Sequence, residues 1–355
     1  MKKIYIIAEI GCNHNGDKEL ARRMVLEAKK CGVDGVKFQT FKADALISKY
    51  APKAEYQKVT TGTSDSQLEM TRKLELSQQD YLELRDYALS LGLDVFSTPF
   101  DLDSIAFLAE SGQHVWKIPS GEITNRPYLE KISQIRCENK RIILSTGMAL
   151  IEEVQACLGV LLEAGAKKEE ITILHCNTEY PTPDCDVNVL AISDLHKHFP
   201  EYSIGFSDHS VGSVAAVIAT ALDIVMIEKH FTLDKNFPGP DHKASATPAE
   251  LKEIVDNVRR AEAMLGSSTK IVSESERKNK IVARKSIIAK CSIKKGEVFS
   301  EENLTCKRPG NGISPMEWYH VLGMTAERDF EADRSEEHTS ELQSHHDLVC
   351  RLLLE

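Results

Sequence analysis

The stretch 141–178 decides the fold of this chain. RIILSTG (141–147) is followed by IEEVQACLGVLLEAG (151–165) and then by ITILHCNT (171–178). The first and third segments are short apolar runs that end in small polar residues, a pattern typical of buried strands. The middle segment repeats apolar residues at helical spacing. This order predicts two parallel strands joined by a crossover helix.

The same pattern extends in both directions along the chain. Six further apolar runs end in the same way: IYIIAEIG (4–11), VDGVKFQT (33–40), LDVFSTPF (93–100), HVWKIPSG (114–121), YSIGFSDHS (202–210) and DIVMIEKHF (223–231). Helical segments alternate with the runs, and eight strands are the number that closes a (β/α)8 TIM barrel. An open doubly wound sheet is the structural alternative. It is disfavoured because no GxGxxG follows any of the runs.

Residues 1–265 are therefore predicted to form the barrel, with a long loop at 41–80 on the active-site face. Residues 266–285 are polar and charged and are interpreted as a linker. Residues 286–333 carry turn signals and short apolar runs typical of a small β-rich domain, which is close to the size limit for independent folding. Residues 334–355 (RSEEHTSELQSHHDLVCRLLLE) resemble a translated sequencing adapter, so we expect a non-native tail and a small domain truncated at its C-terminus.

Composition limits the compartment and the partners. The chain has 355 residues, a net charge of -10 and a pI of about 5.7, which disfavours nucleic-acid binding. Nine cysteines, an odd number without a CxxC pair, are typical of a reducing cytosol. Glu9 interrupts the N-terminal apolar run, and no stretch approaches the ~20 apolar residues of a membrane span. We therefore expect a cytoplasmic protein that binds neither nucleic acid nor membrane.

Polar side chains gather at the strand ends. In a parallel barrel, alternate residues of each strand point inward, and functional groups lie at the carboxyl ends. This alternation brings two lysines and four hydroxyls to one mouth: Lys37, Lys117, Thr98, Ser120, Ser145 and Ser207. A single lysine at a strand end is usually a solvated surface charge, but Lys37 and Lys117 lie in apolar strands where burial without a partner is costly. The set predicts a site for a phosphate or a similar anion.

Two histidines, His209 and His230, end neighbouring strands and are placed to share one divalent cation with open positions for water or substrate. A lone histidine at a strand end is more often structural. His14, His175 and His242 lie near the same mouth, so the sequence alone does not fix the ligand pair.

Carboxylates accompany these histidines. Glu9, Glu122, Asp208 and Asp241 are candidates for orienting ligands, binding sugar hydroxyls or moving protons, with structural salt bridges as the competing interpretation. Glu228 also ends a strand and receives no role.

Ten motifs then occur together: IAEIGCNHNG, VKFQTFKAD, FSTPFD, WKIPSGE, LSTGM, LHCNTEYPTP, GFSDHS, IEKHFTLD, GPDHKAS and KRPGNGISPMEWY. In this combination the chain closely resembles the bacterial N-acetylneuraminate synthases, the sialic acid synthase family, over residues 1 to about 333. The resemblance implies a phosphoenolpyruvate-condensing barrel followed by an antifreeze-like SAF (β-clip) domain. It implies a domain-swapped homodimer in which the small domain caps the partner's barrel. The implied transferase joins phosphoenolpyruvate, N-acetylmannosamine and water into N-acetylneuraminate and phosphate.

The resemblance also implies roles for individual residues. The residues that hold phosphoenolpyruvate are Lys37, Thr98, Lys117, Ser120, Ser145, Asn177, Thr178 and Ser207. The residues that contact the sugar, an N-acyl amino sugar, are Gln39, Tyr180 and Arg308, the last reaching it from the other subunit. The implied ligands of a divalent metal, usually Mn(II), are His209 and His230. The implied catalytic carboxylates are Glu122, Glu9 and Asp241.

Other activities are compatible with much of this pattern. The first alternative is the same chemistry on a diacetylated dideoxy sugar, giving N,N'-diacetyllegionaminate, although the wording of residues 41–80 and 270–320 favours the neuraminate enzymes. The pseudaminate branch differs at the GPD segment. A metal-dependent pyruvate aldolase is an alternative of another class, which would release no phosphate and would have little need for paired lysines. A non-catalytic sugar-binding protein is disfavoured by the intact polar strand ends.

Overall fold

A computed structural model of the chain describes residues 3–61 and 64–333. The chain divides into two compact units, Met1–Gly266 and Ser267–Glu355, and each is described by itself. The predicted adapter-like tail, 334–355, lies outside the described residues.

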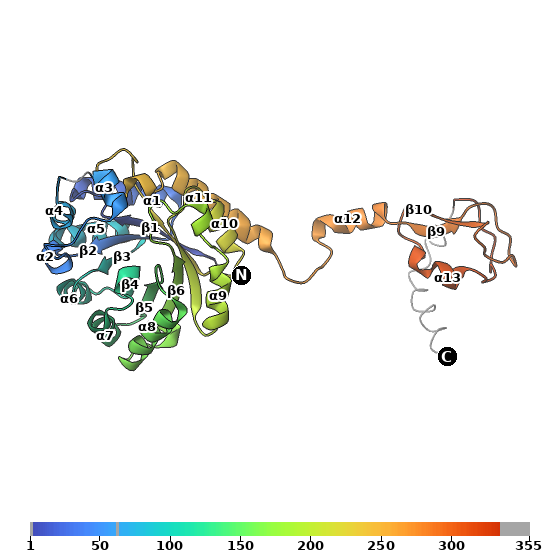
Figure 1. Cartoon of the computed structure of the whole chain (residues 1–355). Coiled ribbons are helices and arrows are strands. Elements are labelled where there is room, and N and C mark those ends of the chain that lie inside the picture. Colours follow the sequence, from blue (N-terminus) through green and yellow to red (C-terminus); the bar gives the residue numbers. More distant parts are fainter. Residues whose placement is uncertain (1–2, 62–63, 334–355) are drawn as a thin grey trace. The chain divides into compact units, whose positions relative to one another are not determined.

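Eight parallel strands form the centre of the first unit (Figure 1). They are β1 (Tyr5–Gly11), β2 (Gly35–Thr40), β3 (Asp94–Pro99), β4 (Val115–Ile118), β5 (Arg141–Ser145), β6 (Ile171–Cys176), β7 (Ser203–Asp208) and β8 (Met226–His230). Their hydrogen-bonded order is β3-β2-β1-β8-β7-β6-β5-β4. The two end strands, β3 and β4, contact each other, so the sheet forms a nearly closed barrel. The predicted fold class is confirmed.

Helices surround the strands (Figure 1). The main ones are α1 (Lys18–Cys31), α5 (Gln78–Ser90), α6 (Leu102–Glu110), α7 (Arg126–Gln134), α8 (Ile151–Glu163), α9 (Ala191–His198), α10 (Val214–Thr220) and α11 (Pro248–Leu265). Their ends follow local sequence signals. The Asp17 side chain accepts hydrogen bonds from the first amides of α1, and Gly32 ends that helix with a φ of 86°.

The predicted loop at 41–80 is more ordered than the sequence suggests. It contains α2 (Ala43–Leu46), α3 (Glu55–Thr61) and α4 (Gln67–Arg72). Helix α4 begins at a capping box in which Ser66 and Glu69 bond each other's backbone amides. The helices are too short to show helical periodicity, which is why a loop is predicted there.

The barrel interior changes from apolar to polar along the strands. One layer of inward side chains is apolar: Ile7, Phe96, Val115, Ile143, Leu174 and Met226. Gly205 belongs to this layer, because a Cβ there would lie 2.5 Å from Leu174 and 2.7 Å from Met226. Two residues further along the same strands come Glu9, Thr98, Lys117, Ser145, Cys176, Glu228 and Ser207. Since strand side chains alternate with a period of two, this second layer also points inward and places the polar groups at the carboxyl ends.

The second unit is small and partly β-structured. Its elements are α12 (Glu274–Ala283), β9 (Ser286–Ala289), β10 (Leu304–Lys307) and α13 (Trp318–Val321). β9 and β10 pair antiparallel, and Ile287, Ile293 and Leu304 belong to their apolar core. Helix α12 falls within the predicted linker and begins at a capping box. Among the described residues, no helix is both long and apolar enough to cross a membrane.

Candidate active site at the carboxyl ends of the barrel strands

Two lysines and two carboxylates meet inside the barrel. Lys37 Nζ lies 2.5 Å from Glu9 Oε2 and 3.7 Å from Glu228 Oε2, and Lys117 Nζ lies 4.0 Å from Glu228 Oε1. None of these four side chains is more than 5% exposed. We call Glu9, Lys37, Lys117 and Glu228 the lysine–carboxylate cluster. Buried lysines require partners, and the two carboxylates supply them.

Hydroxyl groups surround this cluster. Lys37 donates to Thr98 Oγ1 at 3.1 Å, Lys117 donates to Ser145 Oγ at 2.5 Å, and Ser207 donates to Glu228 Oε1 at 3.0 Å. Ser120 lies one loop away, where its Oγ accepts a hydrogen bond from the Gly147 amide at 3.0 Å. Both predicted lysines and three of the four predicted hydroxyls therefore belong to one set of contacts, in which each hydroxyl bonds one member of the cluster.

Burial and charge act in opposite directions on these groups. Burial alone would raise the pKa of Glu228, but Lys117 and Lys37 outweigh it and hold that pKa below its ordinary value. Burial lowers the pKa of Lys117, and Lys37 adds repulsion, although Glu228 opposes both. Burial raises the pKa of Glu9 to about 7 against the influence of Lys37. An incoming anion therefore competes with internal carboxylates for the two ammonium groups.

The histidine pair, His209 and His230, lies beside the cluster. Their ring centroids are 5.2 Å apart, and the Tyr180 ring lies 4.2 Å from His209 and 5.3 Å from His230. His209 Nδ1 bonds the Asn177 carbonyl, and its Nε2 lies 3.4 Å from Ser207 Oγ. Because Ser207 also bonds Glu228, the histidine pair and the lysine–carboxylate cluster share one site.

The donor set of the histidine pair fits a divalent metal ion. A backbone carbonyl fixes one nitrogen of His209, as in many metal-binding histidines, so that Nε2 is the nitrogen that would bind a metal. His230 Nδ1 is buried, and no residue that the structure describes forms a hydrogen bond with it. Burial, reinforced by His209, holds the pKa of His230 well below its ordinary value, so that this imidazole is neutral. Within residues 3–61 and 64–333 no group of three or more His, Cys, Asp or Glu is placed to hold a metal, so water and substrate would complete the shell.

The other histidines near the mouth are engaged in local hydrogen bonds. His14 Nδ1 accepts a hydrogen bond from a backbone amide two residues later, at 3.0 Å. His175 Nε2 bonds the Val187 carbonyl at 2.8 Å, and His242 Nδ1 bonds the Thr232 hydroxyl at 2.7 Å. His209 and His230 differ in that their rings contact each other, so within the part of the chain that the structure describes they are the stronger candidates for one shared metal ion.

Three other predicted residues lie around the site. Gln39 Nε2 donates to Glu9 Oε1 at 3.1 Å. Asp241 is buried, with Cys12 Sγ 3.5 Å from its Oδ2, and burial raises its pKa. Thr178 lies against the turn after β5, where a Cβ on Gly147 would be 2.7 Å from its methyl group.

The side chains of the remaining three predicted residues are not joined to the cluster by the contacts described, although the Asn177 backbone carbonyl bonds His209. Glu122 Oε2 accepts a hydrogen bond from Asn125 at 2.5 Å. The Asn177 side-chain amide donates to the Asp186 carbonyl at 3.2 Å, within its own loop. Arg308 belongs to the second unit. The roles expected of these residues stay predictions.

Two residues at the site have no predicted role. Glu228 lies between both lysines, and Cys176 Sγ lies 3.8 Å from His209 Nδ1. The alternation that identifies Lys117 and Ser145 also places Cys176 and Glu228 on the inward side, so the signal is present in the sequence.

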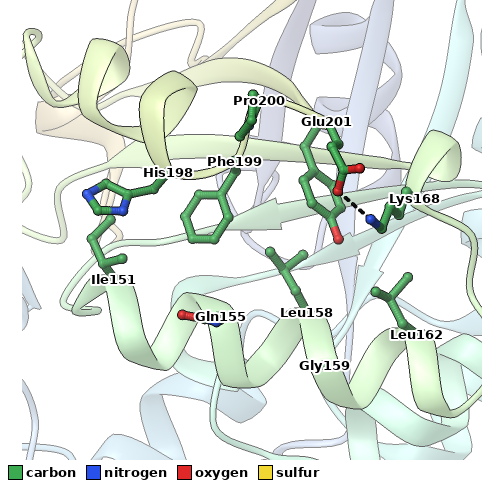
Figure 2. Close-up of a pocket in the computed structure, with 11 residues that line it drawn as sticks. Ile151, Gln155, Leu158, Gly159, Leu162, Lys168, His198, Phe199, Pro200 and Glu201 are labelled. Carbon is green, nitrogen blue, oxygen red and sulfur yellow. Dashed lines mark hydrogen bonds and ion pairs between the residues drawn. The ribbon is translucent and has the colours of Figure 1, made fainter.

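A separate groove of about 380 Å³ lies on the outer, helical side of the barrel (Figure 2). Leu158 of α8 and Phe199 contribute apolar walls, and an ion pair joins Lys168 to Glu201. None of the predicted site residues lines this groove.

Comparison with known proteins places this site in a family. The family model described as the NeuB family matches residues 24–270, and the SAF domain model matches residues 284–335. The chain belongs to the NeuB family. The expected pairing of a synthase barrel with an SAF domain is confirmed.

Relatives of this NeuB-family enzyme match it over nearly its whole length. An N,N'-diacetyllegionaminic acid synthase of Campylobacter jejuni is 50% identical, over 94% of this chain and 98% of the relative. A protein of the same name from Legionella pneumophila is 43% identical, over 90% and 89%. Among solved structures, an N-acetylneuraminic acid (sialic acid) synthetase from Leptospira borgpetersenii superposes with a TM-score of 0.69 at 29% identity, covering 78% of this chain and 90% of that one.

Proposed function

We propose that this enzyme condenses phosphoenolpyruvate with a diacetylated dideoxy amino sugar, giving N,N'-diacetyllegionaminate and phosphate. The observation that supports this sugar is the 50% identity to the Campylobacter jejuni synthase over 98% of that protein. The amino-acid sequence of residues 41–80 and 270–320 favours N-acetylmannosamine. The similarity to the two legionaminic acid synthases favours the diacetylated dideoxy sugar instead. N-acetylmannosamine, giving N-acetylneuraminate, is the second candidate, and the Leptospira structure supports it at lower identity.

The lysine–carboxylate cluster suits the recognition of phosphoenolpyruvate. Lys37 and Lys117 bind its anionic groups, and Thr98, Ser145 and Ser207 are hydrogen-bonding hydroxyls beside them. Because these side chains are buried, their charges act with little screening by solvent. Holding both reactants in line contributes much of the rate enhancement.

The bond changes follow from the two substrates. C3 of phosphoenolpyruvate attacks C1 of the open-chain sugar, and positive charge develops at C2. Water adds at C2, and one of its protons passes to the former aldehyde oxygen, which becomes a hydroxyl. The C2–O bond to phosphate then breaks, C2 becomes a keto carbon, and the second proton of the water leaves with phosphate. Glu9 and Glu228, buried beside the lysines, offset the positive charge that develops. Glu122, Glu9 and Asp241 are the proposed carboxylates for orienting this water and taking its proton.

The proposal includes a divalent metal, a dimer and a cytoplasmic location. A metal ion on His209 and His230, which we expect to be Mn(II), would polarise the sugar aldehyde when bound. We infer a homodimer in which the small unit of one subunit, with Arg308, caps the barrel of the other and reaches the N-acyl group. The cysteine composition supports a reducing compartment.

A product assay tests the proposal. Purified enzyme is given phosphoenolpyruvate and either sugar, with and without Mn(II), while product mass and released phosphate are measured. We expect the higher kcat/KM with the diacetylated dideoxy sugar and one phosphate per product. A preference for N-acetylmannosamine would assign neuraminate synthesis instead. Condensation with pyruvate and no phosphate release would indicate an aldolase.

A further inference from the structure

A buried ion pair lies behind the histidine pair, on the outer side of the barrel wall. Asp208 of β7 and Lys229 of β8 are directly opposite in the strand ladder, with Lys229 Nζ 2.9 Å from Asp208 Oδ2. Their side chains are 0% and 2% exposed. His209 follows Asp208 in the sequence, and His230 follows Lys229. Because side chains alternate along a strand, Asp208 and Lys229 point outward while the two histidines point inward.

Both side chains also bond Ser210, the residue that follows His209. Asp208 Oδ1 accepts hydrogen bonds from the Ser210 amide at 2.8 Å and from the Ser210 hydroxyl at 2.6 Å. Lys229 donates a second hydrogen bond to the Ser210 carbonyl. An aspartate that bonds the amide two residues later fixes a tight turn, and here the enclosed residue is His209.

We propose that Asp208 and Lys229 are positioning residues that set the separation and direction of His209 and His230 for one metal ion. Neither touches the metal or the substrates, so their effect passes through the backbone of the two strands. The inference rests on the proposed metal role of the histidine pair. Replacing a buried ion pair by apolar residues is often neutral for stability, so stability alone does not explain a pair at this place. Mutating a residue that orients a metal ligand typically weakens metal binding about 10–100-fold.

A double variant separates positioning from stability. Asp208→Leu/Lys229→Met removes both charges and fills the space with apolar atoms. We expect a folded protein with a somewhat lower metal-free Tm, because Ser210 loses its side-chain partners, and a Kd for Mn(II), measured by titration calorimetry below that Tm, raised about 10–100-fold. The matched control is Asp34→Leu/Arg259→Met, which removes an ion pair of 2.8 Å before β2, at the opposite end of the strands. This control should leave the Kd for Mn(II) unchanged.

An unchanged Kd in the Asp208/Lys229 double variant would overturn the inference. If that variant does not fold, Asp208→Asn is measured in its place. It keeps an oxygen for Ser210 but presents an N–H group to Lys229, so it should weaken Mn(II) binding, and an unchanged Kd would again refute positioning.

His209→Ala separates this inference from the proposed function. If the wild type does not bind Mn(II), or if His209→Ala binds it equally well, the metal role itself is wrong. If His209→Ala loses binding while the double variant retains it, only the positioning role is wrong.

Discussion

Replacing Glu228 with glutamine removes one negative charge from the lysine–carboxylate cluster and keeps the shape of the side chain. At 3.7 and 4.0 Å from the two ammonium groups, each attraction is about 4 kcal/mol at an effective dielectric constant of about 20. The cost of burying the charges offsets much of this gain, and breaking one partner of a buried pair typically costs about 3–5 kcal/mol. For a unit of this size, 1 kcal/mol lowers Tm by about 2–4 °C, so we expect Tm to fall by roughly 6–20 °C.

The same variant should respond more strongly to an anion. Without Glu228 the cluster carries an additional net positive charge, and inorganic phosphate then meets less competition for Lys37 and Lys117. A ligand that binds the folded state stabilises it by RT ln(1 + [L]/Kd). A tenfold lower Kd for phosphate, about 1.4 kcal/mol, would add roughly 3–6 °C to the phosphate-dependent increase in Tm at saturating phosphate.

The measurement is thermal unfolding followed by tryptophan fluorescence. Trp116 lies in the barrel and Trp318 in the second unit, so a Trp318→Phe background lets Trp116 report barrel unfolding alone. Glu130→Gln is the matched control, because Glu130 belongs to α7, bonds Arg126 and has no proposed role in the site. A Tm equal to that of the wild type, or an equal increase with phosphate in both proteins, would refute the charge argument.

Three further predictions address the site and its surroundings. His209→Ala should abolish metal-dependent turnover, and wild-type steady-state rates at saturating Mn(II) would exclude His209 as a ligand. Arg308→Ala should raise the KM for the sugar more than that for phosphoenolpyruvate; equal increases would contradict contact with the sugar. Burial lowers the pKa of His14 from 6.5 to about 4, so the unfolded state takes up its proton first, and stability is lost as pH falls from 6.5 to 4, by about 3 kcal/mol. In urea unfolding, the free energy of unfolding of His14→Asn should therefore fall less between pH 7 and pH 4 than that of the wild type. An equal fall in both proteins would contradict this prediction.

The strands and their inward residues are predictable because both depend on local pattern. Each of the eight apolar runs contains one barrel strand, and the alternation within it correctly directs Lys37, Lys117 and Ser145 inward. The short helices of 41–80 and helix α12 are not predictable in this way. Their stability depends on single caps such as Ser66, which a search for periodic apolar residues does not detect.

The sequence by itself determined the barrel and the polar strand ends. It also identified the side chains that gather there, which are lysines with hydroxyls and histidines with carboxylates. Only the tertiary structure decided which of them meet. Glu9 and Lys37 are paired residues of adjacent strands, but Glu228 reaches Lys37 across an intervening strand and Lys117 across the barrel. Alternation gives the direction of a side chain, whereas the distance between two inward groups depends on how the sheet curves and closes. The partners of both buried lysines, and the contact between the His209 and His230 rings, follow from that closure.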